Sequence, residues 1–482
     1  MVKDLPSIKK NYIYILAYKI LTIITPLITA PYVARVLGAD NIGIFSFTNA
    51  HVAYFVLFGV FGLSSYSQFE CAKRRDDKIA FSQFCVESIL TRFIFMGTSI
   101  VIYCYLYVFS SSEYSMYYAV LTVVLLSNLI DFTWICEGLE KYKIISIRNS
   151  VVRLISVFAV FIFVKDKSDL LWYLLINSLV VFCGNVALIP YVKKFIYIKE
   201  LSKVKIIPHV KSAMLFFLPA VASTILNTTD KLMIGWLTND ITQNGYYEQA
   251  VKIEMMIFMV FSSLYTSMRG RMAYIYSTGK DNPNIYINKA LAAILFLSMP
   301  ICVGMIQLAD VFVPWFFGDG YDGVIVLLQI MAGWIIVKSF SNCIWELAIF
   351  FAGDISRATL IVWIGVLFNI IFNPFAISRM GAVGAAIVSL LSEVMVLLIV
   401  LYMTSGRIKF SNLKDDAIKE LLAATFMFGG MCLIESIIQN NTMGVLVEIL
   451  VGIIIYLIII FIMKVKIASV FLKLIWDKLG TH

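Results

Sequence analysis

Seven cationic side chains lie inside long apolar stretches of this 482-residue sequence. A lysine or arginine at the centre of a membrane helix costs about 2.5 to 3.5 kcal/mol, so such residues usually face protein or water. Their ammonium and guanidinium groups can bind phosphate through charge-assisted hydrogen bonds or form structural ion pairs. The seven are Lys19, Arg35, Arg92, Arg153, Lys231, Lys252 and Lys338.

The apolar stretch 213–238 carries a polar pattern with helical spacing. Four polar residues fall within about 100° of one another at 100° per residue, and they are Ser223, Asn227, Asp230 and Lys231. This spacing predicts one polar stripe along a helix. Because Asp230 and Lys231 are adjacent, they could also be neutralised through contacts with neighbouring helices.

The next stretch, 244–268, begins with Asn244, Gly245 and Tyr246 and carries two acidic residues and one lysine. Glu248 and Lys252 are four residues apart, in the order that favours a helical ion pair, and Glu254 follows. The pair either neutralises itself or contributes charge to a binding site.

The first stretch, 12–37, carries hydroxyl groups on an arc of about 80°, with Lys19 and Arg35 roughly 60° beyond its two ends. The hydroxyl groups belong to Thr22, Thr25, Thr29 and Tyr32. They either line a polar cavity or bond back to carbonyls of their own helix. Two prolines in the same stretch permit bending.

Two further groups of charged residues are candidates for a site. Lys338, Asn342 and Glu346 follow each other at steps of four, which predicts an internal network. Asp131 and Glu393 are lone carboxylates deep in apolar stretches, where burial disfavours the ionised form. Each is therefore either a protonation site or an ion-pair partner of Arg92, Arg153 or Lys338.

The composition requires a membrane to hold these residues. The chain is 61% hydrophobic and 14% charged, whereas soluble domains are about 45 to 50% apolar and about 25% charged. A spanning helix needs about 20 mostly apolar residues. Fourteen candidate windows lie near 12–37, 42–68, 80–110, 114–138, 145–164, 169–192, 213–238, 244–268, 286–317, 322–351, 356–378, 381–404, 417–438 and 442–463. We expect an all-α polytopic membrane protein, which excludes soluble, disordered and disulfide-scaffold classes.

The distribution of cations predicts the orientation of these spans. With the N-terminus inside, the inner segments carry 29 Lys and Arg residues and the outer segments three. Cations collect on the cytoplasmic side, so both termini should be cytoplasmic, and the first span should stay attached rather than be cleaved as a signal peptide. The net charge of +9 then needs no nucleic acid, and the expected partner is anionic lipid.

The sequence also suggests an internal duplication. A turn around Gly38 to Gly43 and a second turn around Asp240 to Gly245 lie about 202 residues apart, each between two long apolar windows. This arrangement predicts two parallel repeats, between which transporters place their substrates. We expect a six-helix bundle at 1–200, a second at 201–411, and two additional helices with a basic tail at 412–482.

The sequence lacks the motifs that several kinds of catalysis and ligand binding require. There is no phosphate-binding Gly-x-x-x-x-Gly-Lys-Ser/Thr motif, and no Ser, His and Asp set in a predicted outer loop. Eight separate cysteines and three histidines predict neither a metal site nor disulfides. We therefore expect no cofactor. We also expect that any transport is either driven by a gradient or passive.

The chain resembles polysaccharide repeat-unit flippases, the O-antigen, capsule and exopolysaccharide branch of the multidrug/oligosaccharidyl-lipid/polysaccharide exporter superfamily. The resemblance covers nearly the whole chain. It is carried by the motifs Leu37-Gly38, Asp131 to Lys143, Thr229-Asp230-Lys231-Leu232-Met233-Ile234-Gly235 and Asn244-Gly245-Tyr246-Tyr247. One departure is Met268-Arg269-Gly270, where relatives often have a proline-arginine step.

The resemblance implies two six-helix bundles in a V, two extra helices and a cationic central cavity. The implied cargo is an undecaprenyl-diphosphate-linked oligosaccharide moved to the outer leaflet of the bacterial inner membrane, with H⁺ or Na⁺ counter-transport. The implied partners are glycosyltransferases and a polymerase of the same pathway. The resemblance and the residue patterns together give the candidate cavity residues, which are Lys19, Arg35, Asn227, Lys231, Tyr246 and Lys252. The candidates for ion coupling are Asp230 and Glu248, together with Asp131 and Glu393, which the residue patterns alone indicate. The residue patterns also indicate a secondary network of Arg92, Arg153, Lys338, Asn342 and Glu346.

The chemistry of the residues agrees with this cargo. An anionic, hydrated headgroup cannot cross about 30 Å of hydrocarbon bare, whereas cations in a wet cavity replace its counter-ions and Tyr, Asn and Ser suit sugar hydroxyls. A drug/cation antiporter would want an acidic cavity. A lipid II flippase is a second alternative, and an integral membrane polymerase a third, although the latter would want a substantial outer loop.

Overall fold

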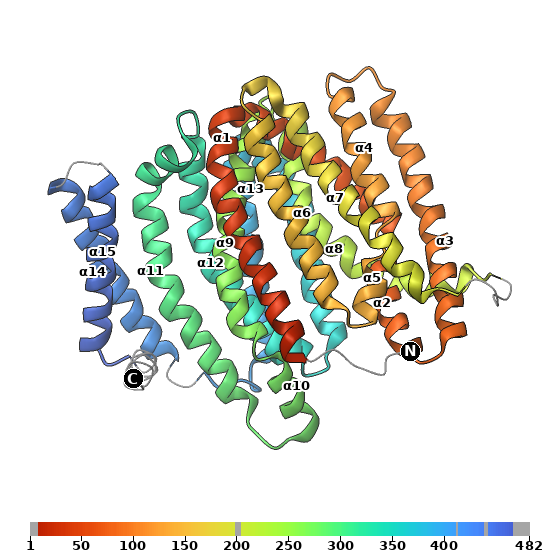
Figure 1. Ribbon diagram of the computed structural model, residues 1–482. Helices are drawn as coiled ribbons and strands as arrows, with labels where there is room; N and C mark the ends of the chain where they lie inside the picture. Colours follow the sequence, from red (N-terminus) through yellow and green to blue (C-terminus); the bar gives the residue numbers. More distant parts are fainter. Residues whose placement is uncertain (1–7, 198–203, 411–412, 438–441, 466–482) are drawn as a thin grey trace. The chain divides into compact units, whose positions relative to one another are not determined.

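The computed structural model describes residues 8–197, 204–410, 413–437 and 442–465. All secondary structure within these ranges is helical (Figure 1). The chain divides into two compact units, Met1–Gly245 and Tyr246–His482. The basic segments 1–7, 198–203 and 466–482, for which a cytoplasmic location was predicted, lie outside the described residues.

The first unit is a bundle of long apolar helices with short connections. Asp77 begins α3 by accepting hydrogen bonds from the backbone N–H groups of Ile79 and Ala80, both at 3.0 Å, which satisfies donors that a helix start leaves unpaired. The elements are α1 (Ile8–Val60), α2 (Leu63–Arg74), α3 (Lys78–Tyr103), the π-helical η1 (Cys104–Val108), α4 (Ser115–Leu129), α5 (Thr133–Gly138), α6 (Tyr142–Phe163), η2 (Lys167–Asp169), α7 (Leu170–Val192), η3 (Lys193–Phe195) and α8 (Ile207–Leu237).

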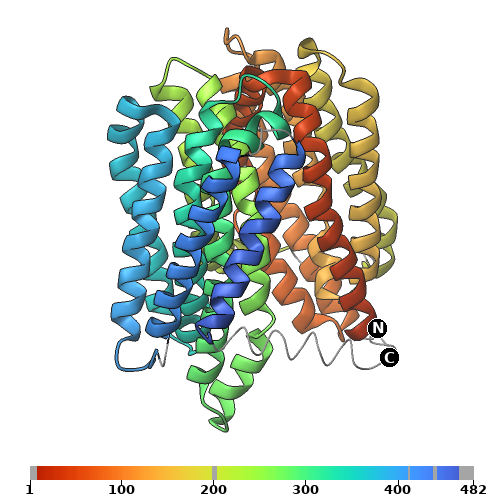
Figure 2. The same cartoon turned by 90° about the vertical axis from the view of Figure 1, so that its left-hand side faces the viewer.

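The second unit is also helical. Pro283 begins α11, where its missing N–H is not needed, and Asn282 accepts a hydrogen bond from the backbone N–H of Asn284. The elements are α9 (Thr242–Thr266), which starts at the end of the first unit, α10 (Arg269–Thr278), α11 (Pro283–Phe317), α12 (Gly323–Ile344), the π-helical η5 (Trp345–Phe350), α13 (Ile355–Thr404), α14 (Leu413–Ile437) and α15 (Thr442–Ile462). Figure 2 shows α14 and α15 (blue) side by side as an antiparallel pair that packs against α11.

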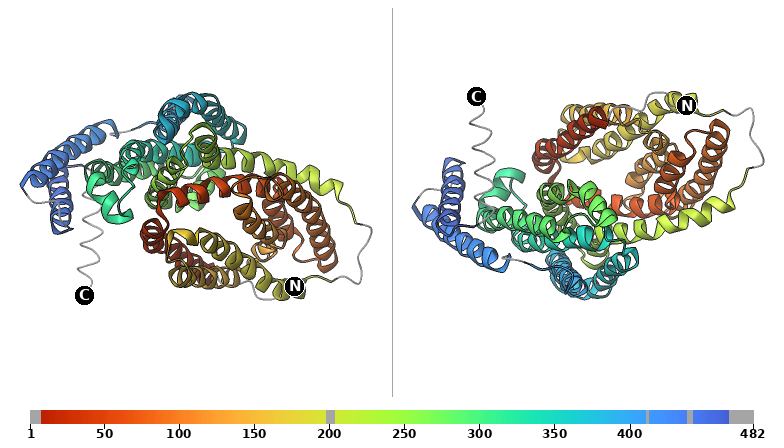
Figure 3. Two further views of the ribbon diagram at one scale, coloured as in Figure 1. Left: turned by 90° about the horizontal axis from the view of Figure 1, so that it is seen from above. Right: turned by 90° about the horizontal axis from the view of Figure 1, so that it is seen from below.

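Twelve helical stretches of the described residues are long and apolar enough to cross a membrane. Figure 3 shows the helices of each unit from above and from below. Two stretches, Leu16–Arg74 and Ile355–Thr404, have 59 and 50 residues. At 1.5 Å per residue each is far longer than the roughly 30 Å hydrocarbon layer. Each is interrupted by a glycine with non-helical backbone, Gly38 (φ 79°) and Gly381 (φ 58°), which divides α1 and α13 into two helices each.

The two turns that the sequence analysis related to each other meet in the first unit. The Thr242 hydroxyl donates a 2.6 Å hydrogen bond to the Asp40 carboxylate, and these residues are 202 positions apart. Residues separated by the predicted repeat length of 202 positions are therefore in direct contact.

The helices at these turns cross with almost no space between their backbones. A Cβ atom added to Gly43 would lie 2.0 Å from the carbonyl oxygen of Ile241, and one added to Gly245 would lie 2.0 Å from that of Ala39. The two contacts are related by the same shift of 202 residues. Only glycine allows the two helices to cross this closely. The two equivalent contacts are those expected of two repeats that face each other.

Candidate functional site

The polar stripe predicted on α8 contains residues in three environments. Asp230 is 5% exposed, Lys231 is half-buried and Asn227 is exposed. The Asn227 amide donates a 2.7 Å hydrogen bond to the Ser223 carbonyl of the same helix. Close to Asp230, the Tyr54 hydroxyl of α1 lies 2.5 Å from the Thr229 hydroxyl. The stripe therefore packs on one side against the second half of α1.

The three threonines of the hydroxyl arc predicted on the first half of α1 are satisfied within the helix, whereas the Tyr32 hydroxyl of the same arc donates to the Val164 carbonyl at 2.7 Å. Thr22, Thr25 and Thr29 each donate to a carbonyl four residues earlier, at 2.9, 2.8 and 3.0 Å. Lys19 and Arg35, beyond the two ends of the arc, are exposed. Of the two interpretations of the threonines, back-bonding to their own helix is the one found.

The pair predicted on α9 is present in the second unit. Lys252 Nζ lies 3.6 Å from Glu248 Oε1, with Glu248 buried and Lys252 half-buried. Tyr246 begins the same unit, half-buried and edge-on to Tyr321. Whether Lys231 of α8 and Lys252 of α9 serve one cavity stays a prediction.

An open cavity of about 570 Å³ lies within the first unit, between α1, α2, α4 and α8. Its wall includes amide and hydroxyl groups from Asn49, Ser65, Asn128 and Thr224, together with apolar side chains and the ring of Phe216. Such a mixture of apolar surface and a few polar groups is typical of small-molecule sites.

Arg92 lies directly behind this wall. Its side chain is 2% exposed, and its guanidinium donates hydrogen bonds to Ser64 Oγ at 2.6 Å and to the backbone carbonyl of Asp131 at 2.5 Å. The Asp131 carboxylate instead accepts from the backbone N–H and the hydroxyl of Thr133, where α5 begins. Arg92 has no carboxylate within 4 Å among the described residues, so a positive charge remains beside the cavity.

The other arginine predicted for this network, Arg153, does not reach Asp131. It is half-buried, and its Nε finds no hydrogen-bond partner in the described part of the chain. Its neighbour one and a half turns earlier, Arg148, is held by the side chains of Asn149 and Asn185 at 2.7 to 3.0 Å. Of the three partners considered for Asp131, the structure brings Arg92 to it.

In the second unit, three charged residues from three helices form a cluster in which Glu254 is buried and Lys338 and Glu393 are half-buried. The ammonium group of Lys338 lies 3.7 Å from the ring centre of Trp334 and 4.9 Å from that of Phe258. Two carboxylates, Glu254 of α9 and Glu393 of α13, interact electrostatically with it. Glu393 accepts a hydrogen bond from Ser341. Oε1 of Glu254, a residue only 3% exposed, has no hydrogen-bond partner among the described residues.

The predicted line of Lys338, Asn342 and Glu346 does not act as one network. Asn342 donates to the Lys338 backbone carbonyl at 2.9 Å. Glu346 forms a two-pronged ion pair with Arg269, with 2.9 Å between Nη2 and Oε2. Thus Lys338 joins the carboxylate cluster, and Glu346 ties η5 to the start of α10.

The segment that departs from related sequences, Met268 to Arg271, is held by acidic partners. After Arg269, Arg271 contacts the Asp281 carboxylate at 3.3 Å and the Tyr286 hydroxyl at 2.6 Å. Asp281 is half-buried in the turn after α10, where the Tyr286 hydroxyl and the Asn282 N–H donate to it. These hydrogen bonds, with that of Tyr286 first, hold the pKa of Asp281 below its ordinary value of 3.8.

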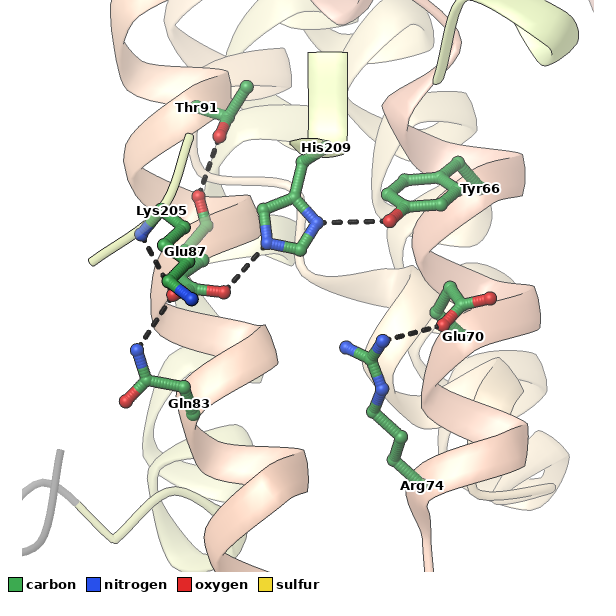
Figure 4. A network of polar contacts seen from close by, with 8 residues as sticks. All are labelled: Tyr66, Glu70, Arg74, Gln83, Glu87, Thr91, Lys205 and His209. Atoms are coloured by element: carbon green, nitrogen blue, oxygen red, sulfur yellow. Dashed lines mark hydrogen bonds and ion pairs between the residues drawn. The ribbon is translucent and has the colours of Figure 1, made fainter. Parts of the chain in front are cut away.

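Sequence reasoning missed a buried network at the start of α8 (Figure 4). The His209 ring contacts the Glu87 carboxylate of α3 at 2.7 Å and the Tyr66 hydroxyl of α2 at 2.9 Å. Glu87 also accepts from Gln83 at 2.7 Å and from the backbone N–H of Lys205 at 2.9 Å. The network fixes the beginning of α8 on the first unit. The signal in the sequence was a histidine at the end of a basic linker, 122 residues from its partner.

None of these clusters has the composition of a metal centre. Within the described residues, no group of three or more His, Cys, Asp or Glu side chains is placed to hold a metal ion. All eight cysteines are free thiols.

Comparisons with known proteins place the chain in a family. The family model described as "Polysaccharide biosynthesis protein" matches residues 8–268. A protein named "Putative O-antigen transporter" from Escherichia coli (strain K12) is 23% identical over 401 residues, covering 81% of this chain and 95% of that protein. A protein of the same name from Shigella dysenteriae is 21% identical over 403 residues, covering 82% and 99%.

Solved structures show the same fold. The lipid II flippase MurJ in an inward closed conformation matches with a TM-score of 0.74 at 17% identity, over 92% of this chain and 98% of that one. An inward-facing multidrug resistance MATE family transporter of the MOP superfamily matches with a TM-score of 0.60 at 14% identity, over 82% and 96%. Because the family model covers more than half of a chain that also has this membrane fold, the chain belongs to the polysaccharide biosynthesis protein family.

Proposed function

We propose that the chain is a flippase that carries an undecaprenyl-diphosphate-linked oligosaccharide repeat unit from the cytoplasmic to the outer leaflet of the bacterial inner membrane. It is a transporter and not an enzyme, in line with the names of its O-antigen transporter relatives. Transport proceeds by alternating access and ends before a polymerase of the same pathway uses the unit.

The observation that carries the proposal is the placement of Lys231. This half-buried cation belongs to a membrane-spanning helix whose side chains also line an open cavity with a few polar groups in its wall. A diphosphate must lose water and counter-ions to enter a membrane, and an ammonium group in a wet site replaces both. The undecaprenyl tail stays in the lipid.

A topology of fourteen crossings follows if each of the two glycine-interrupted stretches crosses the membrane twice, which brings the twelve candidate spans to fourteen. Both termini are then cytoplasmic, as the distribution of cations indicates. We retain the division into two six-helix bundles, 1–200 and 201–411, followed by two additional helices in 412–482. The meeting of Gly43 and Gly245 supports the repeat that this division assumes.

Transport is coupled to H⁺ or Na⁺ at the cluster of Glu254, Lys338 and Glu393. Of the carboxylates expected to couple ions, Asp131 accepts hydrogen bonds from Thr133 at the start of α5, and Glu248 pairs with Lys252. One buried and one half-buried carboxylate beside one ammonium carry one negative charge in excess, which is costly without a partner. The site therefore takes up one monovalent cation, and Oε1 of Glu254, which has no hydrogen-bond partner in the described part of the chain, is available to hold it.

Cells that need the polymer test the cargo. Lys231→Ala combined with Lys252→Ala should strip the surface polysaccharide while the protein inserts at normal levels; Lys414→Ala, in the predicted cytoplasmic part of α14, is the control. Normal polysaccharide in the double variant refutes the assignment of these cations. Cell death rather than polymer loss on deletion of the gene favours lipid II, the substrate named for the structurally similar flippase, over the repeat unit.

A further inference from the structure

The wall of the cavity in the first unit includes polar groups that have no role in the proposed binding of the diphosphate at Lys231. Ser65 of α2 and Thr224 of α8 line it, and neither hydroxyl has a hydrogen-bond partner among the described residues. Asn49 of α1 also lines it, with its amide nitrogen engaged by the Phe45 carbonyl at 3.1 Å, which leaves the amide oxygen as an acceptor. These groups come from three helices and include both donors and acceptors.

The remaining wall is apolar and includes one aromatic ring. Phe216 is half-buried, and its ring lies 6.1 Å from that of Tyr66 and 6.4 Å from that of Phe69. Val52, Val56 and other apolar side chains of α1 line the cavity as well. Hydroxyl and amide groups beside an aromatic face match the two kinds of surface that a sugar ring presents.

The charge beside the cavity is positive. Ser64 and Asn128 both line the cavity, and both accept hydrogen bonds from the buried guanidinium of Arg92. Arg92 forms no ion pair with the described residues: its guanidinium is held by neutral hydrogen-bond acceptors, and the Asp131 carboxylate interacts with it only at longer range. The cavity therefore favours a hydrated neutral or anionic group over a cation.

The face of α8 that lines the cavity continues toward Lys231. Phe216, Ala220 and Thr224 are spaced by four residues, and Asn227 and Lys231 fall on the same face, all within about 80° at 100° per residue. Thr224 and Lys231 are seven residues apart, or about 10 Å along the helix axis. A diphosphate bound at Lys231 would thus place the first sugars of its chain at the level of the cavity.

We propose that this cavity is the subsite for the first sugars of the lipid-linked oligosaccharide, and that its shape selects among repeat units. The inference rests on the proposed function, which supplies the diphosphate at Lys231. Thr224, Ser65 and Asn49 hydrogen-bond the sugar hydroxyls, and the ring of Phe216 packs against the apolar face of a sugar. A volume of about 570 Å³ lies within the range of about 300 to 1,000 Å³ that small-molecule sites occupy.

Two variants of the full chain test the subsite by binding in lipid nanodiscs. Ala220→Phe fills the cavity, and Thr224→Val removes one hydroxyl at nearly constant volume. The matched control is Leu218→Phe, since Leu218 is 45% exposed on the same helix and does not line the cavity. The probes are undecaprenyl diphosphate without sugar and the undecaprenyl-diphosphate-linked oligosaccharide from cells that make the native polymer. Thermal unfolding of each variant reports whether it is folded.

The inference predicts a selective loss of affinity for the sugar-bearing lipid. Ala220→Phe should weaken its binding more than tenfold, and Thr224→Val about fivefold, the value of one hydrogen bond. Binding of undecaprenyl diphosphate should change less than twofold in both variants, and Leu218→Phe should resemble the wild type.

Two outcomes would overturn the inference while the proposed function stands. In one, the wild type binds the sugar-bearing lipid and Ala220→Phe leaves that affinity unchanged. In the other, a folded Ala220→Phe weakens both lipids equally, which assigns the cavity to the lipid tail. Failure of the wild type to bind either lipid defeats the proposed function itself and the subsite with it.

Discussion

The crossing of the two repeat-related turns gives the most quantitative prediction about stability. Gly43→Ala and Gly245→Ala each place a Cβ atom 2.0 Å from a backbone carbonyl oxygen, whereas favourable contacts lie near 3.5 to 4.0 Å. Because a backbone oxygen cannot swing aside, the helices must separate by more than 1 Å. Overpacking of this kind costs about 3 kcal/mol, and the better helix propensity of alanine returns about 1 kcal/mol. We therefore expect each variant to lose about 2 kcal/mol of stability.

Gly97→Ala is the matched control. Gly97 lies within α3, and a Cβ atom added there meets no atom within 4 Å, so alanine should stabilise the helix by about 1 kcal/mol. Thermal unfolding of the purified protein should separate this control from either crossing variant by roughly 6 °C. If Gly245→Ala unfolds at the same temperature as Gly97→Ala, the close approach of the two turns is wrong.

The symmetry of the crossing adds a second, sharper test. The clashes at Gly43 and Gly245 are equal in distance and lie on the same pair of helices. Once the helices separate to accommodate one methyl group, the second finds space, so the double variant should cost about 1 to 2 kcal/mol less than the sum of the single variants. Strict additivity would contradict a shared contact.

Three further predictions concern the polar groups of the two units. Arg92→Ala should lower the stability of the protein by about 3 kcal/mol in thermal unfolding, because several buried hydrogen bonds to one charged group are lost; a loss below 1 kcal/mol would mean that water replaces the guanidinium. Glu87→Ala leaves the buried His209 ring nitrogen without its acceptor, so hydrogen exchange at the start of α8 should rise at least tenfold, and unchanged exchange would argue against this anchor. Asp281 has a lowered pKa because the Tyr286 hydroxyl donates to it, so Asp281→Asn should be less stable than the wild type at neutral pH. That difference should disappear as the pH falls from 3.8 through the lower folded value, and a difference that persists in acid would refute the assignment.

The features that the sequence predicted well are those fixed by local spacing. The stretches 213–238 and 244–268 correspond to α8 (Ile207–Leu237) and α9 (Thr242–Thr266), because apolar length alone identifies a membrane helix. The pair of Glu248 and Lys252 followed from a spacing of four residues.

The features that could not be predicted depend on contacts between distant segments. Arg92 binds the backbone carbonyls of Asn128 and Asp131, which are available because the helix breaks between α4 and α5, and no side-chain pattern reveals that break. Glu254 could be noted only as a residue after an ion pair, since its neighbours Lys338 and Glu393 come from two other helices. Which helix faces meet is decided by packing, and periodicity does not contain that information.

The most direct test of the central claim is a leaflet-exchange measurement with the purified protein. Undecaprenyl-diphosphate-linked oligosaccharide is placed in vesicles that contain wild-type protein or Lys231→Ala, and the fraction of sugar exposed to an external lectin is followed in time. The account predicts exchange with the wild type at least tenfold faster than with Lys231→Ala at equal reconstitution. Equal rates for the two proteins, or no exchange above protein-free vesicles with the wild type in the presence of H⁺ and Na⁺ gradients, would contradict it.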